Sequence, residues 1–201
     1  MEQGTSTIIR NMITDFLNVG SFDVPRYVLM GTGFTSLDES PNAQAESRPY
    51  ISDRSSTSII RGYEAQFPYN ADIIASEEAI MKIYEIGRNQ RQAGEAEADY
   101  VRCEAFMPTG IHNVHPARKF RVAVEVTDTT GEGTQIIESS GNLNAVGDFI
   151  PGCFNIDTKT FYPGVVTRTP DNEELVTVQV GMETVELLKG LFLIDTGVPT
   201  P

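Results

Sequence analysis

Alternating apolar and polar residues run along most of the chain and predict β-strands. In residues 57–67 the two kinds of side chain change with period two, and residues 118–127 repeat that pattern. The sequence DTTGEG at 128–133 predicts a hairpin turn after the second of these strands. Further short runs bounded by turn residues predict strands or strand pairs at 26–33, 100–106, 134–139, 154–161, 175–180 and 185–194.

Residues 72–88 depart from this pattern because their apolar residues recur at helical spacing. Asn70 or Asp72 is suited to cap the start of the helix, and Glu78 and Lys82 stand four residues apart in the favourable order. The apolar stripe covers one side only, so we expect the helix to lie on the outside of a sheet. The stripe consists of Ile73, Ile80, Ile83, Tyr84 and Gly87.

Two segments carry less regular patterns. The apolar residues between positions 8 and 17 are spaced as in a short amphipathic helix or a docking arm. Residues 34–55 are polar and contain two prolines, and they predict a long loop. Loops longer than about 12–15 residues are uncommon in compact domains and are usually functional or disordered. The segment is therefore the most unusual part of the chain.

Together these elements predict a mainly β (α+β) fold, a sandwich or barrel with one helix at its side. We expect an N-terminal arm over residues 1–20 and a single β domain over 21–201. That domain includes the loop at 34–55 and a β-rich C-terminal extension at 163–201. The pattern leaves open whether the extension is a surface element or completes the core.

Charge and composition exclude several classes of protein. The 201 residues include 28 acids and 15 Lys or Arg, giving a formal charge of −13, so a tight binder of duplex DNA is not expected. No apolar run approaches the roughly 20 residues that span a bilayer, and the polar start MEQGTSTIIR carries no signal core. Two well-separated cysteines favour reduced thiols, with a single disulfide as the alternative.

Motifs of catalysis and metal binding are incomplete. His112 and His115 form an H-x-x-H pair, but no further ligand stands at a familiar spacing, so we expect two loop histidines. The glycines of MGTG at 30–33 lack the lysine of a phosphate-binding loop and predict a tight bend instead. No nucleophile motif occurs. We predict no enzyme, no catalytic residue, no metal and no cofactor.

The order of features over residues 29–87 resembles the major tail tube proteins of long-tailed (siphophage-like) bacteriophages and prophages. The matching features are a strand ending in MGTGF, a polar loop with an Ala-Gln pair that closes with YISDRS, and then a strand carrying GY. The dipeptide FP at 67–68 and the predicted helix come after that strand. A weaker resemblance continues over GNLNAVGDFIPGCFNIDTKTF at 141–161.

This resemblance implies a β-sandwich or half-open barrel with a flanking helix. Such proteins form hexameric rings that stack into a hollow tail tube, and hairpin strands of neighbouring subunits merge into one β-barrel around the lumen. Phage DNA passes through without specific binding. The implied partners are further copies of the chain and the tail terminator, tape measure and baseplate or tail-tip proteins. The implied location is the virion tail, after synthesis in the bacterial cytoplasm, with no membrane anchor.

The resemblance also implies two sets of site residues. The polar loop is expected to contact other subunits or rings, and lumen-facing positions are expected to carry a net negative charge. The contact candidates are Asp38, Glu39, Pro41, Glu46, Arg48, Tyr50, Asp53 and Arg54. The lumen candidates are Arg61, Lys119, Arg121 and Glu125.

A soluble β-barrel or sandwich that binds a small ligand or peptide is the alternative. Such a module needs a pre-formed apolar pocket. The low aromatic content of 8% and the absence of Trp argue mildly against a site for sugars or aromatic ligands. The two readings differ in concentration dependence, because a tube subunit polymerises and a binding module does not.

Overall fold

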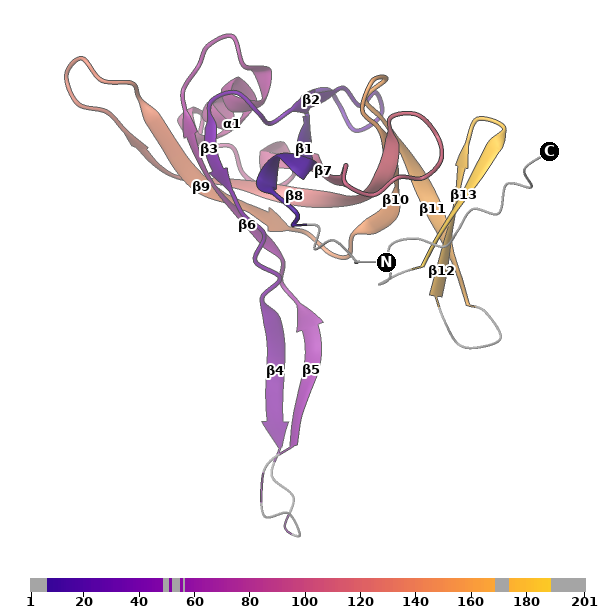
Figure 1. Ribbon diagram of the computed structural model, residues 1–201. Helices are drawn as coiled ribbons and strands as arrows, with labels where there is room; N and C mark the ends of the chain where they lie inside the picture. Colours follow the sequence, from indigo (N-terminus) through magenta and orange to yellow (C-terminus); the bar gives the residue numbers. More distant parts are fainter. Residues whose placement is uncertain (1–6, 49–50, 52–54, 56, 169–173, 189–201) are drawn as a thin grey trace. The chain divides into compact units, whose positions relative to one another are not determined.

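A computed structural model describes residues 7–48, 51, 55, 57–168 and 174–188 (Figure 1). Most of these residues lie in antiparallel strands, which confirms the mainly β prediction. The chain divides into two compact units. Unit 1 comprises Met1–Gly31, Ala98–Arg121 and Gly147–Pro201, and unit 2 comprises Thr32–Glu97 and Val122–Val146.

Unit 1 is built on a sheet with the strand order β13-β12-β11-β10-β8-β7-β1-β2. Strand β10 pairs antiparallel with β8 on one side and with β11 on the other. Strand β8 begins in this unit and supplies its second half to unit 2. The bounds are β1 Ile13–Asn18, β2 Tyr27–Leu29, β7 Glu97–Glu104, β8 Val114–Thr130, β10 Ile150–Asn155, β11 Thr160–Arg168, β12 Glu174–Val180 and β13 Glu183–Leu188.

Two apolar clusters hold unit 1 together. In the first, the rings of Phe16 and Phe154 lie 4.4 Å apart, and Tyr27 meets Phe154 edge-on at 5.6 Å. Val101, Cys103 and Ala117 complete this cluster. The second cluster joins Val114 and Cys153 to valines and a leucine of the β12–β13 hairpin. The described part of the predicted C-terminal extension therefore completes the core. The second cluster consists of Val114, Cys153, Val176, Val178, Val185 and Leu187.

Unit 2 contains a sheet in the order β3-β6-β9-β8, with β3 Phe34–Leu37, β6 Gln66–Asp72 and β9 Glu138–Ala145. Helix α1, Glu78–Arg88, packs close to this sheet. At Gly87 the approach is so tight that an added Cβ would lie 2.8 Å from Cβ of Val126. The helix buries Ala79, Ile80, Ile83 and Ile86.

Unit 2 also contains a two-stranded ribbon formed by β4, Ala43–Arg48, and β5, Thr57–Tyr63. Hydrogen bonds continue the ladder from β3 and β6 into this ribbon: Asp38 N–H donates to the carbonyl of Pro68, and Ser40 exchanges two bonds with Gln66. Figure 1 shows β4 and β5 leading away from β3 and β6 as one twisted hairpin.

Three sequence predictions are wrong in detail. Residues 34–55 are not one loop, because β3 and β4 lie within them and pair with β6 and β5. Helix α1 begins at Glu78 rather than at 72, because Asp72 still pairs with Glu138 in the sheet. Neither Asn70 nor Asp72 caps the helix, since its N-cap residue is Glu77.

The N-terminal segment also differs from the predicted helix. Arg10–Met12 form a single 3-10 turn, and β1 follows directly with a central position in the sheet between β7 and β2. The strand is buried on both faces from Asp15 to Asn18, so its apolar residues do not reveal its period. A second 3-10 turn, Ala93–Ala96, precedes β7. The predicted arm at 1–20 and the single domain at 21–201 stay predictions.

The predicted hairpins are confirmed, but the bounds of the first one are wrong. Strands β8 and β9 pair antiparallel, yet β8 continues to Thr130 and β9 begins at Glu138, so the turn lies at 131–137 and the return strand is not at 134–139. Strands β10 and β11 pair around a turn in which Asn155 Oδ1 accepts from the N–H groups of Asp157 and Thr158. At Lys159 the backbone adopts a φ of 51°, which completes this turn.

Candidate functional site

The sheet of unit 2 has one apolar and one polar face. Phe67, Tyr69 and Leu143 are buried on its core side, and Val122 and Val124 of β8 join them. Because side chains alternate along a strand, the intervening residues point the other way. We call these residues the polar face. It comprises Ser36, Gln66, Pro68, Asn70, Asp72, Ala123, Glu125, Asp128, Thr130, Glu138, Ser140, Asn142 and Asn144.

Hydrogen bonds tie the strands together across the polar face. Asn144 Nδ2 donates to Glu125 Oε2 at 2.8 Å, and Asn70 Nδ2 donates to the hydroxyl of Ser36 at 2.8 Å. Amide, hydroxyl and carboxylate groups make up the polar contacts here. The charged side chains among these residues are the carboxylates of Asp72, Glu125, Asp128 and Glu138, so the face is hydrophilic and acidic.

Strand β3 pairs with β6 and is the outer strand of this sheet within the described residues of unit 2. The second half of β8 pairs with β9, and β7 is a further neighbour of β8 in the sheet order. The N–H and C=O groups along an open edge are a ready template for another strand. The open side of β3 can therefore accept a strand from outside the unit.

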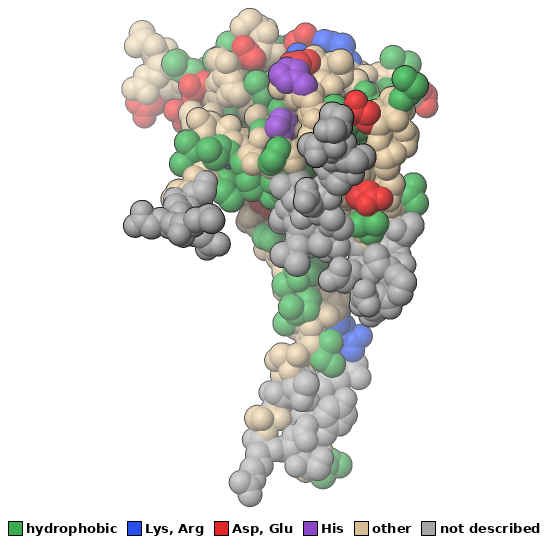
Figure 2. Space-filling model, turned by 45° about the vertical axis from the view of Figure 1, so that its right-hand side comes forward, with side chains coloured by type: hydrophobic (Ala, Val, Ile, Leu, Met, Phe, Trp, Pro, Cys, Tyr) green, Lys and Arg blue, Asp and Glu red, His purple; other side chains and the backbone are tan. Residues whose placement is uncertain are grey.

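The β4–β5 ribbon exposes apolar side chains on both of its faces. Ile59 and Ile60 are neighbours in β5, so they point to opposite faces, and they are 51% and 55% exposed. Tyr63 lies beyond a register shift in the ribbon and pairs with Ala43, which puts it on the side of Ile60, and it is 65% exposed. Figure 2 shows hydrophobic side chains at the surface of this ribbon. Two-stranded hairpins are marginally stable alone in water, so the ribbon is suited to binding a partner.

The two faces of the ribbon differ in chemistry. Beside Ile59, an ion pair joins Arg61 to Glu46 of the opposite strand. Ile60 pairs with Ala45, and Tyr63 on the same side pairs with Ala43. The first face is therefore amphipathic, and the second combines two large apolar side chains with two alanines.

The structure spreads the predicted contact residues over the ribbon and its base. Asp38 and Pro41 are exposed between β3 and β4, Glu39 is half-buried beside them, and Glu46 lies in β4 with its carboxylate on Arg61. Arg48 ends β4, but its side chain lies outside the described part. Tyr50, Asp53 and Arg54 also lie outside the described residues.

The predicted lumen residues fall in three places. Glu125 is on the polar face of unit 2, and Arg61 is on the ribbon. Lys119 and Arg121 belong to the unit 1 half of β8. The ammonium of Lys119 lies 3.8 Å from Asp99 and 5.5 Å over the ring of Phe161.

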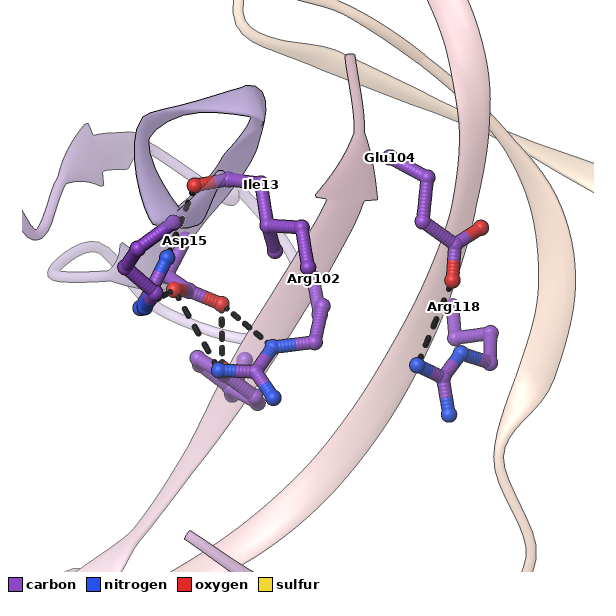
Figure 3. Close-up of polar contacts among 7 residues, drawn as sticks. Ile13, Asp15, Arg102, Glu104 and Arg118 are labelled. Carbon is purple, nitrogen blue, oxygen red and sulfur yellow. Dashed lines mark hydrogen bonds and ion pairs between the residues drawn. The ribbon is translucent and has the colours of Figure 1, made fainter. Parts of the chain in front are cut away.

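A buried charge cluster in unit 1 was not predicted from the sequence (Figure 3). The carboxylate of Asp15, on β1, accepts hydrogen bonds from Tyr100 Oη at 2.5 Å and from Arg102 Nε at 2.8 Å, both on β7. Arg10 Nη2 reaches the second carboxylate oxygen at 2.5 Å. Next to them, Arg118 lies 3.3 Å from Glu104.

This cluster ties neighbouring strands of the sheet together. Asp15 and Arg102 are almost fully buried, and each bond joins β1 to β7 or to the turn that precedes β1. Buried charges are stable only when paired and hydrogen-bonded. A sequence signal existed in the polar residues Thr14 and Asp15 ahead of the apolar pair at 16–17, but the partner strand could not be identified from it.

The remaining candidate chemistry is structural. Cys103 and Cys153 are buried free thiols, so the single-disulfide alternative is wrong, and burial raises the pKa of both thiols to about 12. His115 contacts the carbonyl of Met107 through Nδ1 at 2.9 Å, while His112 is exposed beside Asn113. Across the described residues, no group of three or more His, Cys, Asp or Glu side chains is arranged to hold a metal ion.

Comparison with known proteins gives little similarity. No protein-family model matches the chain, and no curated protein matches it. Among solved structures, a chain in the cryo-EM structure of the anti-feeding prophage baseplate, 6-fold symmetrised, aligns with 73% of this chain and 96% of its own length. The TM-score is 0.44 and the sequence identity is 6%, values too low to establish a common fold. In the part of the chain that the structure describes, no helix is long and apolar enough to cross a membrane.

Proposed function

We propose that the protein is a structural subunit of a phage-type tail, and that its copies form rings that stack into a hollow tube. The sequence resemblance over residues 29–87 suggests this role. The observation that carries it is the unit 2 sheet, which combines the open edge of β3 with a hydrophilic, acidic face. A monomeric domain gains nothing from such an edge, which invites aggregation.

Edge-to-edge pairing between copies would use both properties. If β8 of one copy pairs with β3 of the next, the sheet continues around a ring, and a closed barrel has no free edge left. The apolar face stays covered by α1, so the polar face lines the lumen. A face of amides, hydroxyls and four carboxylates offers phosphate groups no cation to bind, and DNA would pass without being held.

The β4–β5 ribbon would make the contact between rings. Its ladder continues that of β3 and β6, so it is rigidly joined to the strands of the proposed barrel. Ile59, Ile60 and Tyr63 are each at least half exposed and would become buried on docking. This assignment keeps the contact role predicted for the segment, but as a paired ribbon instead of a loop.

The binding-module alternative finds less support. A groove in unit 2 is lined by Tyr84, Gly87, Arg88 and residues 126–129. Its lining mixes an arginine, an aspartate and two threonines with few apolar groups. Ligand pockets are usually concave and mostly apolar, with a few well-placed polar groups.

Electron microscopy tests the proposed assembly. We expect the purified, concentrated protein to form tubes or six-fold rings in negative stain, and fast-sedimenting material in analytical ultracentrifugation. Ile60→Asp should prevent stacking, because docking would bury a carboxylate. Met182→Asp is the matched control, since Met182 is fully exposed in the β12–β13 turn. A protein that stays monomeric at every concentration would overturn the proposal. If the Ile60→Asp variant still forms tubes, the β4–β5 ribbon does not make the contact between rings.

A further inference from the structure

The loop between β1 and β2, residues 19–26, has a backbone locked by one buried side chain. Asn18 Oδ1 accepts from the N–H groups of Gly20 and Arg26 at 2.9 and 2.8 Å, and Asn18 Nδ2 donates to the carbonyl of Ser21. At Gly20 an added Cβ would lie 2.5 Å from the carbonyl oxygen of Val24. The loop is therefore built to hold one conformation.

This rigid loop presents apolar side chains to solvent. Phe22 is 42% exposed and Val24 is 73% exposed. The guanidinium of Arg121, from β8, lies 3.8 Å from the centre of the Phe22 ring. Aromatic residues and arginine are enriched in protein interfaces, and a pre-ordered loop loses little entropy on binding. We call Phe22, Val24 and Arg121 the aromatic knob.

The turn between β8 and β9, residues 131–137, has the complementary chemistry. The N–H of Gln135 donates to the carbonyl of Glu132, and the carbonyl of Ile137 accepts from Ile73 N–H at 2.7 Å. Ile136 is 63% exposed and Ile137 is 50% exposed. Glu132 is exposed in the same turn. We call Glu132, Ile136 and Ile137 the acidic turn.

We propose that the aromatic knob of one copy binds the acidic turn of a second copy. The aliphatic side chains of Ile136 and Ile137 would cover Phe22 and Val24, and the Glu132 carboxylate would meet the Arg121 guanidinium. The occupant follows from charge: the loop carries the exposed Asp23 and Arg26 beside Arg121, a net charge of +1, which fits the acidic, aliphatic turn of a second copy. A polyanion such as DNA is a poor occupant, because its binding needs a cluster of cations and here a carboxylate stands beside the two arginines.

Two different surfaces meet in this contact, so it is heterologous. Each copy uses its knob for one neighbour and its turn for another, and such contacts produce closed rings or open filaments. The inference deepens the proposed function and rests on it, because it names the surfaces that join subunits. It concerns side chains outside the β4–β5 ribbon, so its test is separate from that of stacking.

Site-specific cross-linking tests the contact. Val24→Cys and Ile136→Cys chains are prepared separately, mixed at equal concentration and treated with a short bis-maleimide. Cys103 and Cys153 are buried, so we expect them not to react with the bis-maleimide in any sample. We expect a covalent dimer in the mixture and little in either chain alone, since the contact joins unlike surfaces. Met182→Cys replaces Ile136→Cys in the matched control, which should give no dimer.

Charge reversal provides the second readout. Arg121→Glu, introduced into the Val24→Cys chain, should lower the dimer yield at least about tenfold, because like charges would then face each other. Glu132→Arg in the partner chain should restore it. Any of three results would overturn the inference. They are a mixture that gives no dimer, homodimers formed equally by both chains, and a dimer yield that neither charge reversal changes. If tubes form but the cross-link does not, the proposed function holds and this contact is wrong. If the cross-link forms but tubes do not, the contact holds and the proposed function is wrong.

Discussion

Removal of the Asp15 carboxylate should destabilise unit 1 strongly, because this one buried group is bonded to three other side chains. Asp15 is 1% exposed and is bonded to Tyr100, Arg102 and Arg10. In Asp15→Ala the guanidinium of Arg102, itself 4% exposed, keeps its charge and loses its acceptor. The hydroxyl of Tyr100 loses its partner as well.

The expected cost is about 3–5 kcal/mol, the range for breaking a buried ion pair by removing one partner. Replacing both partners with apolar residues of similar size should cost much less, because no uncompensated charge then stays buried. Asp15→Leu combined with Arg102→Met is that variant. Arg10→Ala is the control: Arg10 is half exposed, and exposed pairs contribute about 0–1 kcal/mol.

Urea unfolding followed by circular dichroism measures these differences, at protein concentrations low enough to keep the chain monomeric. We expect the unfolding midpoint to fall strongly in Asp15→Ala, partly recover in the double variant and barely change in Arg10→Ala. A loss below about 1 kcal/mol in Asp15→Ala would refute the reasoning, since it would mean that the cluster behaves like a surface pair. A double variant as unstable as Asp15→Ala would show that packing, not charge, sets the cost.

Four further outcomes follow from individual residues. Burial raises the pKa of Cys103 and Cys153 to about 12 from about 9 in the unfolded chain, so the thiols should resist maleimide at pH 8. Because the folded chain then holds protons that the unfolded chain releases, the free energy of unfolding should fall as pH rises from 9 towards 12. Gly87→Ala places a methyl group against Val126 and should cost about 1–3 kcal/mol in thermal or urea unfolding. In assembled tubes, Glu125→Lys should retain duplex DNA in co-sedimentation at low salt and release it at high salt, whereas wild-type tubes should retain none.

The sequence predicts strands better than it predicts what they pair with. The alternation of residues 118–127 places apolar side chains on one face of β8, and Phe120, Val122 and Val124 are buried there. This works because a half-buried strand has a period of two that any partner strand preserves. The helix is predicted in the same way, from an apolar stripe on one side, but its predicted start is wrong. Residues 72–77 fit the stripe although they are not helical.

Segments whose structure depends on distant partners were mispredicted. Strand β4 is polar and has no apolar face, so nothing in residues 43–48 distinguishes it from a loop. It is a strand because β5 supplies its hydrogen bonds. Strand β1 is buried on both sides, and a short buried strand cannot be told from a helical segment by periodicity. The Asp15–Arg102 pair joins residues 87 positions apart, a distance over which no local pattern operates.

That separation has a consequence for the order in which the chain folds. Strand β1 is made early, yet its inner neighbour β7 comes more than 80 residues later, and the cluster around Cys153 also needs β12 and β13. Contacts between distant parts of a chain form slowly, because closing long loops costs entropy. Unit 1 therefore cannot close on the ribosome until β13 has been synthesised.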